Sequence, residues 1–440
     1  MRENQELSIQ KKIFSLKLLS GKTSGHLLRT YFVYVFVALL MILTKVVIAR
    51  SYGQTELGVY SYFFALGSFI FLWTSFEFPE ALTQLIVKGK HDLKQIFWLT
   101  GWWILLTTFI GLLVLYLIDS FIYPLFASYS YLFLALGIFV ISHTIYYQLY
   151  SVLRGDKQFA KSSAFSLVWR SLFVIGIFVF ALRGLPFYLV LFLLSACVLV
   201  AAVSMLPDFW KLWKKASSVT HSVTHSVTHK IMTSSNLWKL AFALFLVQVG
   251  FYSLRTIDLY VLERLLSFSE VGFYSAYASF TNVIRLLAYV FPVVVLPMAA
   301  VSNYKIQKSL SRLIVLIIPF SAAVLFVTVW LVPLFYGTEY LGGFWLTFAL
   351  VVSASILLIY SYCSSIFAGE NKVSSKYLWV LGVDFLLSIV GNLLMNYYLI
   401  LRYGIIGAPI ATGIVVFVKV LFLLGAIKWF RVNRKMLKKI

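Results

Sequence analysis

The chain has 440 residues, of which 61% are apolar and only 12% are charged, and its mean hydropathy is +0.93. A soluble domain is about half apolar and a quarter charged, so a water-soluble core of this size could not bury so many apolar side chains. The 37 lysines and arginines outnumber the 15 aspartates and glutamates. This balance excludes an acidic surface protein, and because the basic residues lie between apolar segments it also excludes a nucleic-acid-binding domain.

Twelve apolar segments are long enough to cross a bilayer as helices, whose hydrocarbon core of about 30 Å needs roughly 20 residues. The segments are continuously apolar rather than alternating, which excludes a transmembrane β-barrel. We therefore predict an all-α integral membrane protein with about twelve spans, near residues 28–49, 59–77, 96–118, 129–151, 163–182, 185–206, 238–262, 272–298, 312–334, 343–367, 377–400 and 404–427.

The distribution of basic residues predicts the orientation of these spans. If the N-terminus is cytoplasmic, the inner segments hold 28 lysines and arginines. The outer loops then hold four, at Arg50, Arg183, Arg264 and Arg402. Positively charged loops stay on the cytoplasmic side. Both termini are therefore predicted to be cytoplasmic, and Ile9, Ile13 and Leu16 predict an amphipathic N-terminal helix on the membrane surface.

An internal repeat divides the chain into two halves. Arg50–Ser61 follows the first span and Arg264–Ser275 follows the seventh, and Arg, Glu, Gly, Tyr and Ser match between them at an offset of 214 residues. The same offset relates Gly155-Asp156 to Gly369-Glu370. Each half has six spans and enters the membrane the same way, so we predict two six-helix lobes related by a pseudo-twofold axis along the membrane normal. The predicted parts are an N-terminal lobe at 1–206, a cytoplasmic linker with Ser-Val-Thr-His repeats at 207–237, and a C-terminal lobe at 238–440.

Seven charged residues fall inside the predicted spans, five of them positive and two negative. Each costs about 2.5–3.5 kcal/mol at mid-span, so it should face a partner or a wet cavity. The positive excess is explained if the counter-charge arrives with an anionic ligand such as pyrophosphate, which arginine and lysine bind well. The predicted substrate-binding residues are Arg285, Arg255, Arg170, Lys45 and Lys419, and the predicted ion-coupling or gating residues are Asp258 and Asp384.

Structural alternatives exist for several of these residues. Lys45 and Lys419 could extend their ammonium groups to the membrane surface. Arg255 and Asp258 are three residues apart and could form a local ion pair. Arg170 and Asp384 occupy equivalent repeat positions with opposite charge, which predicts a pair across the lobes or a gate.

Sequence patterns of catalytic sites are absent. The chain has no Ser/His/Asp grouping, Walker A loop, HExxH or CxxC motif. We therefore expect a transporter and not an enzyme, with no cofactor and no metal site. A non-transporting membrane scaffold of a glycan-synthesis complex remains the alternative from another class.

Three features of the sequence carry a family resemblance. They are twelve spans in two lobes, the residues Tyr52-Gly53, Leu57-Gly58 and Tyr60 after the first span, and the basic Arg154–Lys157 stretch after the fourth span. With these features the chain resembles the polysaccharide-transport family of the MOP superfamily, the Wzx-type flippases. The resemblance implies a MOP or MATE-like fold around a central cavity. It also implies a substrate, an undecaprenyl-pyrophosphate-linked oligosaccharide that is flipped to the outer leaflet of the bacterial cytoplasmic membrane during cell-surface polysaccharide biosynthesis.

The implied mechanism is alternating access. The cationic residues would take the pyrophosphate, and outer loops near Arg50 and Arg264 would act as the outer gate. Membrane lipids are expected partners, with a polymerase and other glycan-assembly proteins as further candidates. Within the superfamily, a MATE-type ion-coupled exporter of small molecules is the alternative, although the first span carries Lys45 where such exporters tend to have an acidic residue.

Overall fold

The structure is a computed structural model of the whole chain. It describes residues 21–88, 93–117, 120, 131–156, 158–222, 234–288, 295, 306–370 and 375–437. The predicted amphipathic N-terminus, and His225 and His229 of the linker repeats, lie outside the described residues.

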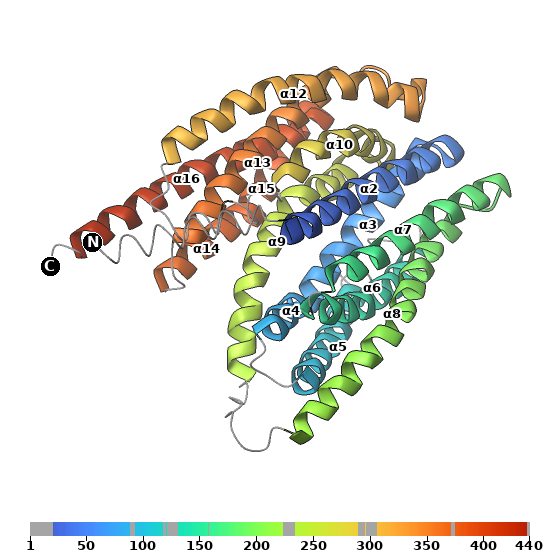
Figure 1. Ribbon diagram of the computed structural model, residues 1–440. Helices are drawn as coiled ribbons and strands as arrows, with labels where there is room; N and C mark the ends of the chain where they lie inside the picture. The colour runs from blue at the N-terminus through green and yellow to red at the C-terminus, as the bar shows by residue number, and fades with distance from the viewer. Residues whose placement is uncertain are drawn as a thin grey trace. The chain divides into compact units, whose positions relative to one another are not determined.

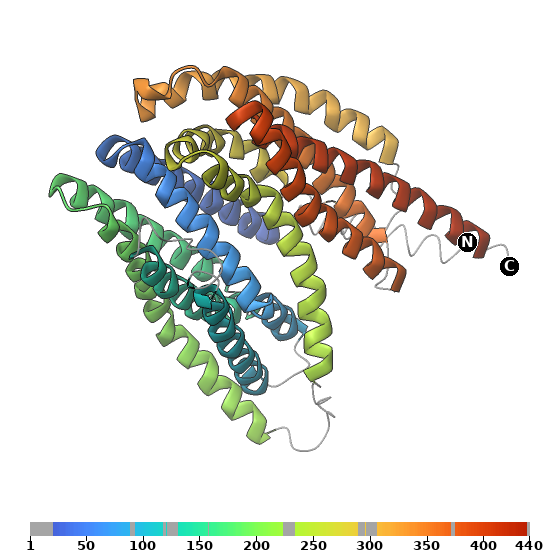
Figure 2. The ribbon, with the colours of Figure 1, turned by 180° about the vertical axis from the view of Figure 1, so that it is seen from behind.

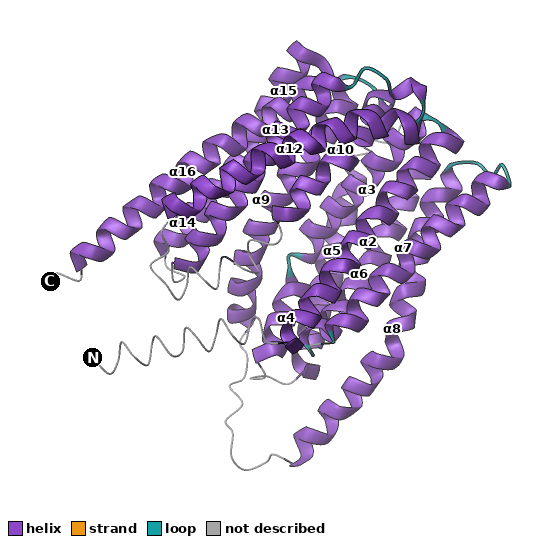
Figure 3. Cartoon of the chain, turned by 45° about the horizontal axis from the view of Figure 1, so that its top comes forward, coloured by secondary structure: helices purple, strands orange, loops and turns teal. Residues whose placement is uncertain are grey.

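Long helices make up the described chain, coloured in chain order in Figure 1. In the first half they are α2 (Gly21–Tyr52), α3 (Gln54–Ser75), α4 (Phe78–Lys88), α5 (Leu93–Leu117), α6 (Tyr131–Gly155), α7 (Phe159–Leu182) and α8 (Tyr188–Ser222). In the second half they are α9 (Ser234–Leu265), α10 (Phe268–Ala288), α12 (Ile306–Tyr336), α13 (Phe344–Glu370), α14 (Ser375–Leu386), α15 (Asn392–Tyr403) and α16 (Gly407–Leu437). Short helical turns η2 (Thr338–Tyr340), η3 (Leu387–Gly391) and η4 (Gly404–Ile406) join some of them, and Figure 3 draws no strand among the described residues.

The predicted membrane spans agree with these helices. Ten described helical segments are long and apolar enough to cross a bilayer, and the last of them, Trp379–Phe430, takes in two of the predicted spans. The predicted span at 272–298 corresponds to α10, which is described as far as Ala288. The all-α membrane fold class is therefore confirmed.

Three helices differ in detail from the predicted spans. The segment after the second span is itself helical, because α4 follows α3 directly after a break at Phe76 and Glu77, which have the positive φ angles of 48° and 56°. Helix α8 continues through Pro207 to Ser222, so the first part of the predicted linker is helical. The span at 377–400 is interrupted by the π-helical turn η3, a feature that often marks functional sites.

Packing divides the chain into two compact units. The first unit contains Met1–Thr44 and Phe78–Leu237, and the second contains Lys45–Glu77 and Trp238–Ile440. Helix α3, at 54–75, thus packs with the C-terminal half. Figure 2 shows the ribbon from behind. The lobe boundaries were predicted from the internal repeat, whereas these two units are defined by packing contacts. The predicted boundaries therefore stay a prediction.

In the first unit, α6 packs against α8 and α4, and α7 also packs against α8. In the second unit, α3 packs against α10, while α13 packs against α10, α12 and α16. A core cluster that includes Leu357, Cys363, Val416 and Leu423 joins α13 to α16. The same cluster includes Leu254 of α9 and Val380 of α14, so it packs the helices that carry Arg255, Asp258, Asp384 and Lys419.

Candidate functional site

A buried polar cluster lies in the second unit, and we define it as Asp258, Tyr274, Asn392, Asn396 and Thr412. Its members come from α9, α10, α15 and α16, and none of them is more than 2% exposed. The Asp258 carboxylate accepts hydrogen bonds from Tyr274 Oη at 2.6 Å, Thr412 Oγ1 at 2.7 Å and Asn396 Nδ2 at 3.3 Å. Three donors on one carboxylate stabilise its charge within the apolar helix bundle.

The two asparagines extend the cluster along one face of α15. Asn396 Nδ2 also donates to the Asn392 side-chain oxygen at 3.0 Å, and Thr412 Oγ1 lies 3.2 Å from that same oxygen. The side-chain oxygen of Asn396 is buried and has no hydrogen-bond partner among the described residues. The cluster therefore gathers one carboxylate, two amide oxygens and a hydroxyl oxygen, which are ligand types that hard monovalent and divalent cations prefer.

Arg285, the predicted substrate-binding arginine of α10, lies beside this cluster. It is only 5% exposed, it interacts electrostatically with Tyr274 and Asp258, and its Nε is buried without a hydrogen-bond partner among the described residues. Among the described residues no ion pair joins Arg285 to Asp258, so the guanidinium lies only within electrostatic range of the carboxylate.

Lys419 and Asp384 form a buried ion pair. Lys419 Nζ lies 3.2 Å from Asp384 Oδ2, the lysine side chain is fully buried, and the Tyr360 hydroxyl donates to the same carboxylate oxygen at 2.7 Å. Lys419 also hydrogen-bonds with Ser388 in the π-helical turn η3. The surface-reaching alternative for Lys419 therefore does not apply, and its charge is neutralised inside the helix bundle.

Asp384, Ser388, Asn392 and Asn396 recur every four residues along α14, η3 and α15. This spacing places them on one helical face. The Lys419–Asp384 pair therefore lies on the same face as the buried polar cluster.

Lys45 and Arg255 lie near each other in the second unit. Lys45 Nζ donates to the Ser275 carbonyl oxygen at 3.4 Å, and the positive charges of Lys45 and Arg255 repel each other. Both side chains are half-buried. An anion bound between these two cations would relieve their repulsion.

Arg170 belongs to the first unit and has different surroundings. Its guanidinium stacks on the Trp169 ring at 4.0 Å from the centroid and donates to the Ser166 carbonyl oxygen at 2.9 Å. Asp384, its predicted opposite, pairs with Lys419 within the second unit. Pairing of Arg170 with Asp384 stays a prediction.

The two predicted outer-gate arginines, Arg50 and Arg264, lie at the C-terminal ends of α2 and α9 and are exposed. Arg50 donates to the carbonyl oxygens of Leu334 and Phe335, both at 2.8 Å, and so caps the C-terminus of α12.

The repeated glycines Gly58 and Gly272 meet where α3 crosses α10. A methyl group on Gly58 would lie 1.7 Å from the Phe268 carbonyl oxygen, and one on Gly272 would lie 2.0 Å from the Gln54 carbonyl oxygen. Gln54 Nε2 also donates to the Ser269 carbonyl oxygen at 2.9 Å. Only glycine permits this close approach of two backbones, so the repeated motif joins α3 to α10.

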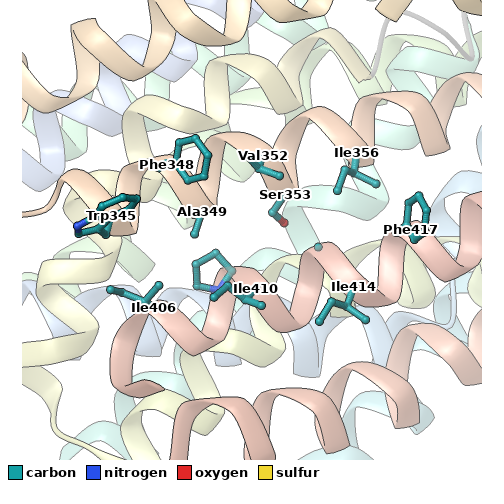
Figure 4. Close-up of a pocket in the computed structure, with 12 residues that line it drawn as sticks. Trp345, Phe348, Ala349, Val352, Ser353, Ile356, Ile406, Ile410, Ile414 and Phe417 are labelled. Carbon is teal, nitrogen blue, oxygen red and sulfur yellow. The ribbon is translucent and has the colours of Figure 1, made fainter. Parts of the chain in front are cut away.

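An open groove of about 570 Å³ runs between α13 and α16 (Figure 4). Its walls include Trp345, Phe348, Ile410 and Phe417, and Ser353 supplies the one hydroxyl group among its lining residues. An anion or a coupling cation has no charged partner among those residues, so the groove is not a candidate for either site.

Sequence reasoning found Asp258 but missed four members of its cluster. Tyr274, Asn392, Asn396 and Thr412 carry no charge, so a search for charged residues in spans passes over them. The available signal is the pair Asn392 and Asn396, two amides four residues apart in an apolar span. Among the described residues, no group of three or more His, Cys, Asp or Glu side chains could hold a metal ion.

Comparison with known proteins agrees with the predicted resemblance. Residues 28–302 match a family described as polysaccharide biosynthesis protein. No curated protein matches the chain.

Solved structures share the fold at low sequence identity. The lipid II flippase MurJ in an inward closed conformation has a TM-score of 0.67 and 18% identity over 91% of this chain and 87% of that chain. The MATE multidrug transporter DinF-BH has a TM-score of 0.58 and 13% identity over 92% of this chain and 94% of that chain. The Vibrio cholerae MATE transporter VcmN in the bent form has a TM-score of 0.57 and 14% identity over 92% of this chain and 97% of that chain. Together with the match over residues 28–302, these likenesses identify the chain as a member of the polysaccharide biosynthesis protein family, with the fold of the MOP superfamily.

Proposed function

We propose that this protein is a flippase for undecaprenyl-pyrophosphate-linked oligosaccharides, which it moves from the inner to the outer leaflet of the bacterial cytoplasmic membrane by alternating access. Both termini are cytoplasmic in this proposal, and the product feeds cell-surface polysaccharide assembly. The family match and the membrane fold support a transporter acting in polysaccharide biosynthesis.

The observation that carries the proposal is the proximity of Lys45 and Arg255. Their mutual repulsion raises the free energy of the site without a ligand. A pyrophosphate between them would remove that repulsion and accept hydrogen bonds from both side chains. The lysine ammonium group would act as a point charge, and the arginine guanidinium would donate two parallel hydrogen bonds. Lys419 already pairs with Asp384, so it contributes less to anion binding.

The buried polar cluster is our candidate site for a coupling cation. The Asp258 carboxylate would supply the negative charge, while Asn392, Asn396 and Thr412 would supply neutral oxygens, including the Asn396 oxygen that has no hydrogen-bond partner among the described residues. One carboxylate with neutral oxygens suits a monovalent cation. Its movement along the membrane potential supplies about 2.3 kcal/mol per 100 mV.

The decisive experiment reconstitutes the purified protein in vesicles with a labelled undecaprenyl-pyrophosphate oligosaccharide and measures the appearance of the label in the opposite leaflet. Lys45→Gln and Arg255→Gln should each reduce the initial rate at least tenfold, a loss of about 1.4 kcal/mol of binding. Lys211→Gln is the matched control, because Lys211 is 79% exposed and lies in the first unit. Unchanged rates in both membrane variants would contradict the proposed anion site.

The MATE-type alternative is tested in the same vesicles with a cationic dye. Its support is the fold shared with MATE multidrug transporters and the buried Asp258. Dye export without turnover of the lipid-linked oligosaccharide would replace our proposal with this alternative.

A further inference from the structure

A cluster of aromatic and basic side chains lies on α6 and α7 of the first unit, and we define the tyrosine–arginine cluster as His143, Tyr146, Tyr147, Tyr150, Trp169 and Arg170. The ring centroids of Tyr146 and Tyr150 are 5.8 Å apart and stacked, and Tyr147 lies 5.5 Å from Tyr146 and 5.8 Å from Tyr150. His143 lies 5.0 Å from Tyr147. Such contacts hold the rings in fixed orientations.

The cluster faces away from the exposed apolar side of each helix. On α6 that side carries Leu134, Ile138, Ile141 and Ile145. Tyr147 is two residues beyond Ile145, a rotation of about 200° around the helix. The tyrosine face is therefore the side of α6 opposite the apolar row.

Helix α7 shows the same arrangement. Val168 and Leu172 are exposed apolar side chains, and Arg170 lies between them in sequence, about 200° from each around the helix. Arg170, Tyr147 and Tyr150 are nevertheless only partly buried. One guanidinium and two tyrosine rings are thus partly exposed on a side of the helices that does not carry the apolar row.

Arg170 is held in place by its neighbours. The Trp169 ring supports one face of its guanidinium, and Ser166 binds the Nη1 end. Arg170 also lies within electrostatic range of His143 and Tyr146 of α6. A guanidinium fixed beside tyrosine rings offers directed N–H donors next to flat apolar surfaces.

We propose that the tyrosine–arginine cluster is a saccharide-binding subsite. A pyranose ring has one apolar face of C–H groups, which stacks on an aromatic ring, and hydroxyl oxygens at its edge, which accept hydrogen bonds from a guanidinium. Tyr147 and Tyr150 supply the stacking surface and Arg170 supplies the donors. The inference rests on the proposed function, because the sugar it binds is part of the lipid-linked cargo.

The test compares two ligands that differ only in the sugar: undecaprenyl pyrophosphate carrying the oligosaccharide, and undecaprenyl pyrophosphate alone. The full-length protein in lipid nanodiscs is titrated with each. Tyr147→Leu and Tyr150→Leu should weaken binding of the saccharide-bearing lipid about three- to tenfold, the size of one lost aromatic contact, and leave binding of the sugar-free lipid unchanged. Arg170→Gln should also weaken binding of the saccharide-bearing lipid.

Two further variants separate recognition from packing. Tyr147→Phe keeps the ring and should retain saccharide binding within about twofold of the unchanged protein. Tyr116→Leu replaces an exposed tyrosine of α5 outside the cluster and should leave binding of both lipids unchanged.

Equal losses for both lipids in the leucine variants, or no loss for either, would overturn the subsite. If the unchanged protein binds and flips both lipids while the variants fail to discriminate between them, the subsite alone is wrong. If the unchanged protein binds neither lipid, the proposed function fails and the subsite fails with it.

Discussion

Lys419 illustrates how a charge is carried inside a bilayer-spanning helix bundle. Its ammonium group is fully buried, lies over the Tyr360 ring at 4.3 Å and pairs with Asp384 at 3.2 Å. Removing one partner of a buried pair leaves the other charge uncompensated. Replacing one residue of the pair should therefore lower the stability of the protein more than replacing both residues with neutral ones.

We expect Lys419→Ala to lower the free energy of unfolding by about 3–5 kcal/mol. The double variant Lys419→Met with Asp384→Asn should lose less, because it removes both charges and keeps the volumes similar. Thermal unfolding in detergent measures both. Lys161→Ala is the control, since its ion pair with Asp208 is exposed and should contribute less than about 1 kcal/mol. A double variant no more stable than the single one would contradict a mutual charge balance.

At the same scale, Asp258→Asn tests the coupling-cation site. The amide keeps the shape of the side chain but removes the negative charge, so we expect flipping to lose its dependence on a monovalent cation gradient. Initial rates in vesicles with and without an imposed sodium or potassium gradient measure this. Asp208→Asn, at an exposed pair of the first unit, should keep the gradient response. A persistent response in Asp258→Asn would place the coupling site elsewhere.

Among the helices, the crossing of α3 and α10 depends on the repeated glycines. Gly58→Ala and Gly272→Ala should each destabilise the protein, because each new methyl group would overlap a backbone carbonyl oxygen of the facing segment. Gly137→Ala is the matched control, since no neighbouring atom lies within 4 Å of the added methyl and alanine favours helix by about 0.5–1 kcal/mol. Thermal unfolding measures the stability of all three variants. If Gly58→Ala and Gly272→Ala are as stable as Gly137→Ala, α3 and α10 can move apart without loss of stability.

The end of α12 depends on Arg50 of α2. We expect Arg50→Ala to destabilise the last turn of α12 by about 1–2 kcal/mol, because two carbonyl oxygens lose charged donors. Hydrogen exchange at the backbone amides of residues 334–337 should then become faster by about tenfold. Arg183→Ala, at an exposed turn between α7 and α8, should leave this exchange unchanged. Equal exchange in both variants would mean that Arg50 does not hold α12.

For the whole molecule, the distribution of basic residues makes a prediction that chemical labelling tests. Arg183→Cys and Arg402→Cys should react with a membrane-impermeant maleimide added to intact cells, whereas Lys161→Cys and Lys211→Cys should react only after the cells are opened. All four native side chains are exposed. The native cysteines, Cys197 and Cys363, are buried and should give little background. The reverse labelling pattern would invert the proposed orientation.

Much of the fold could be predicted because span formation is a local property. An apolar run of about 20 residues must satisfy its backbone hydrogen bonds within the bilayer, and an α-helix does so without help from distant residues. Boundaries were less predictable, as α8 shows by extending through Pro207 to Ser222. The break at Phe76 and Glu77 was also missed, although Pro79 and Glu80 directly after it are typical of a helix start.

The sequence by itself determined the membrane class, the positions of the spans, the family resemblance and the identity of the charged residues inside the spans. Only the tertiary structure decided which of these charges are compensated. Lys419 meets Asp384 across 35 positions of sequence, and Asp258 meets Thr412 across 154, through helix packing that spacing along the chain does not encode. The physical reason is that burying a charge depends on its partners in space, whereas inserting a helix depends on the side chains along one segment.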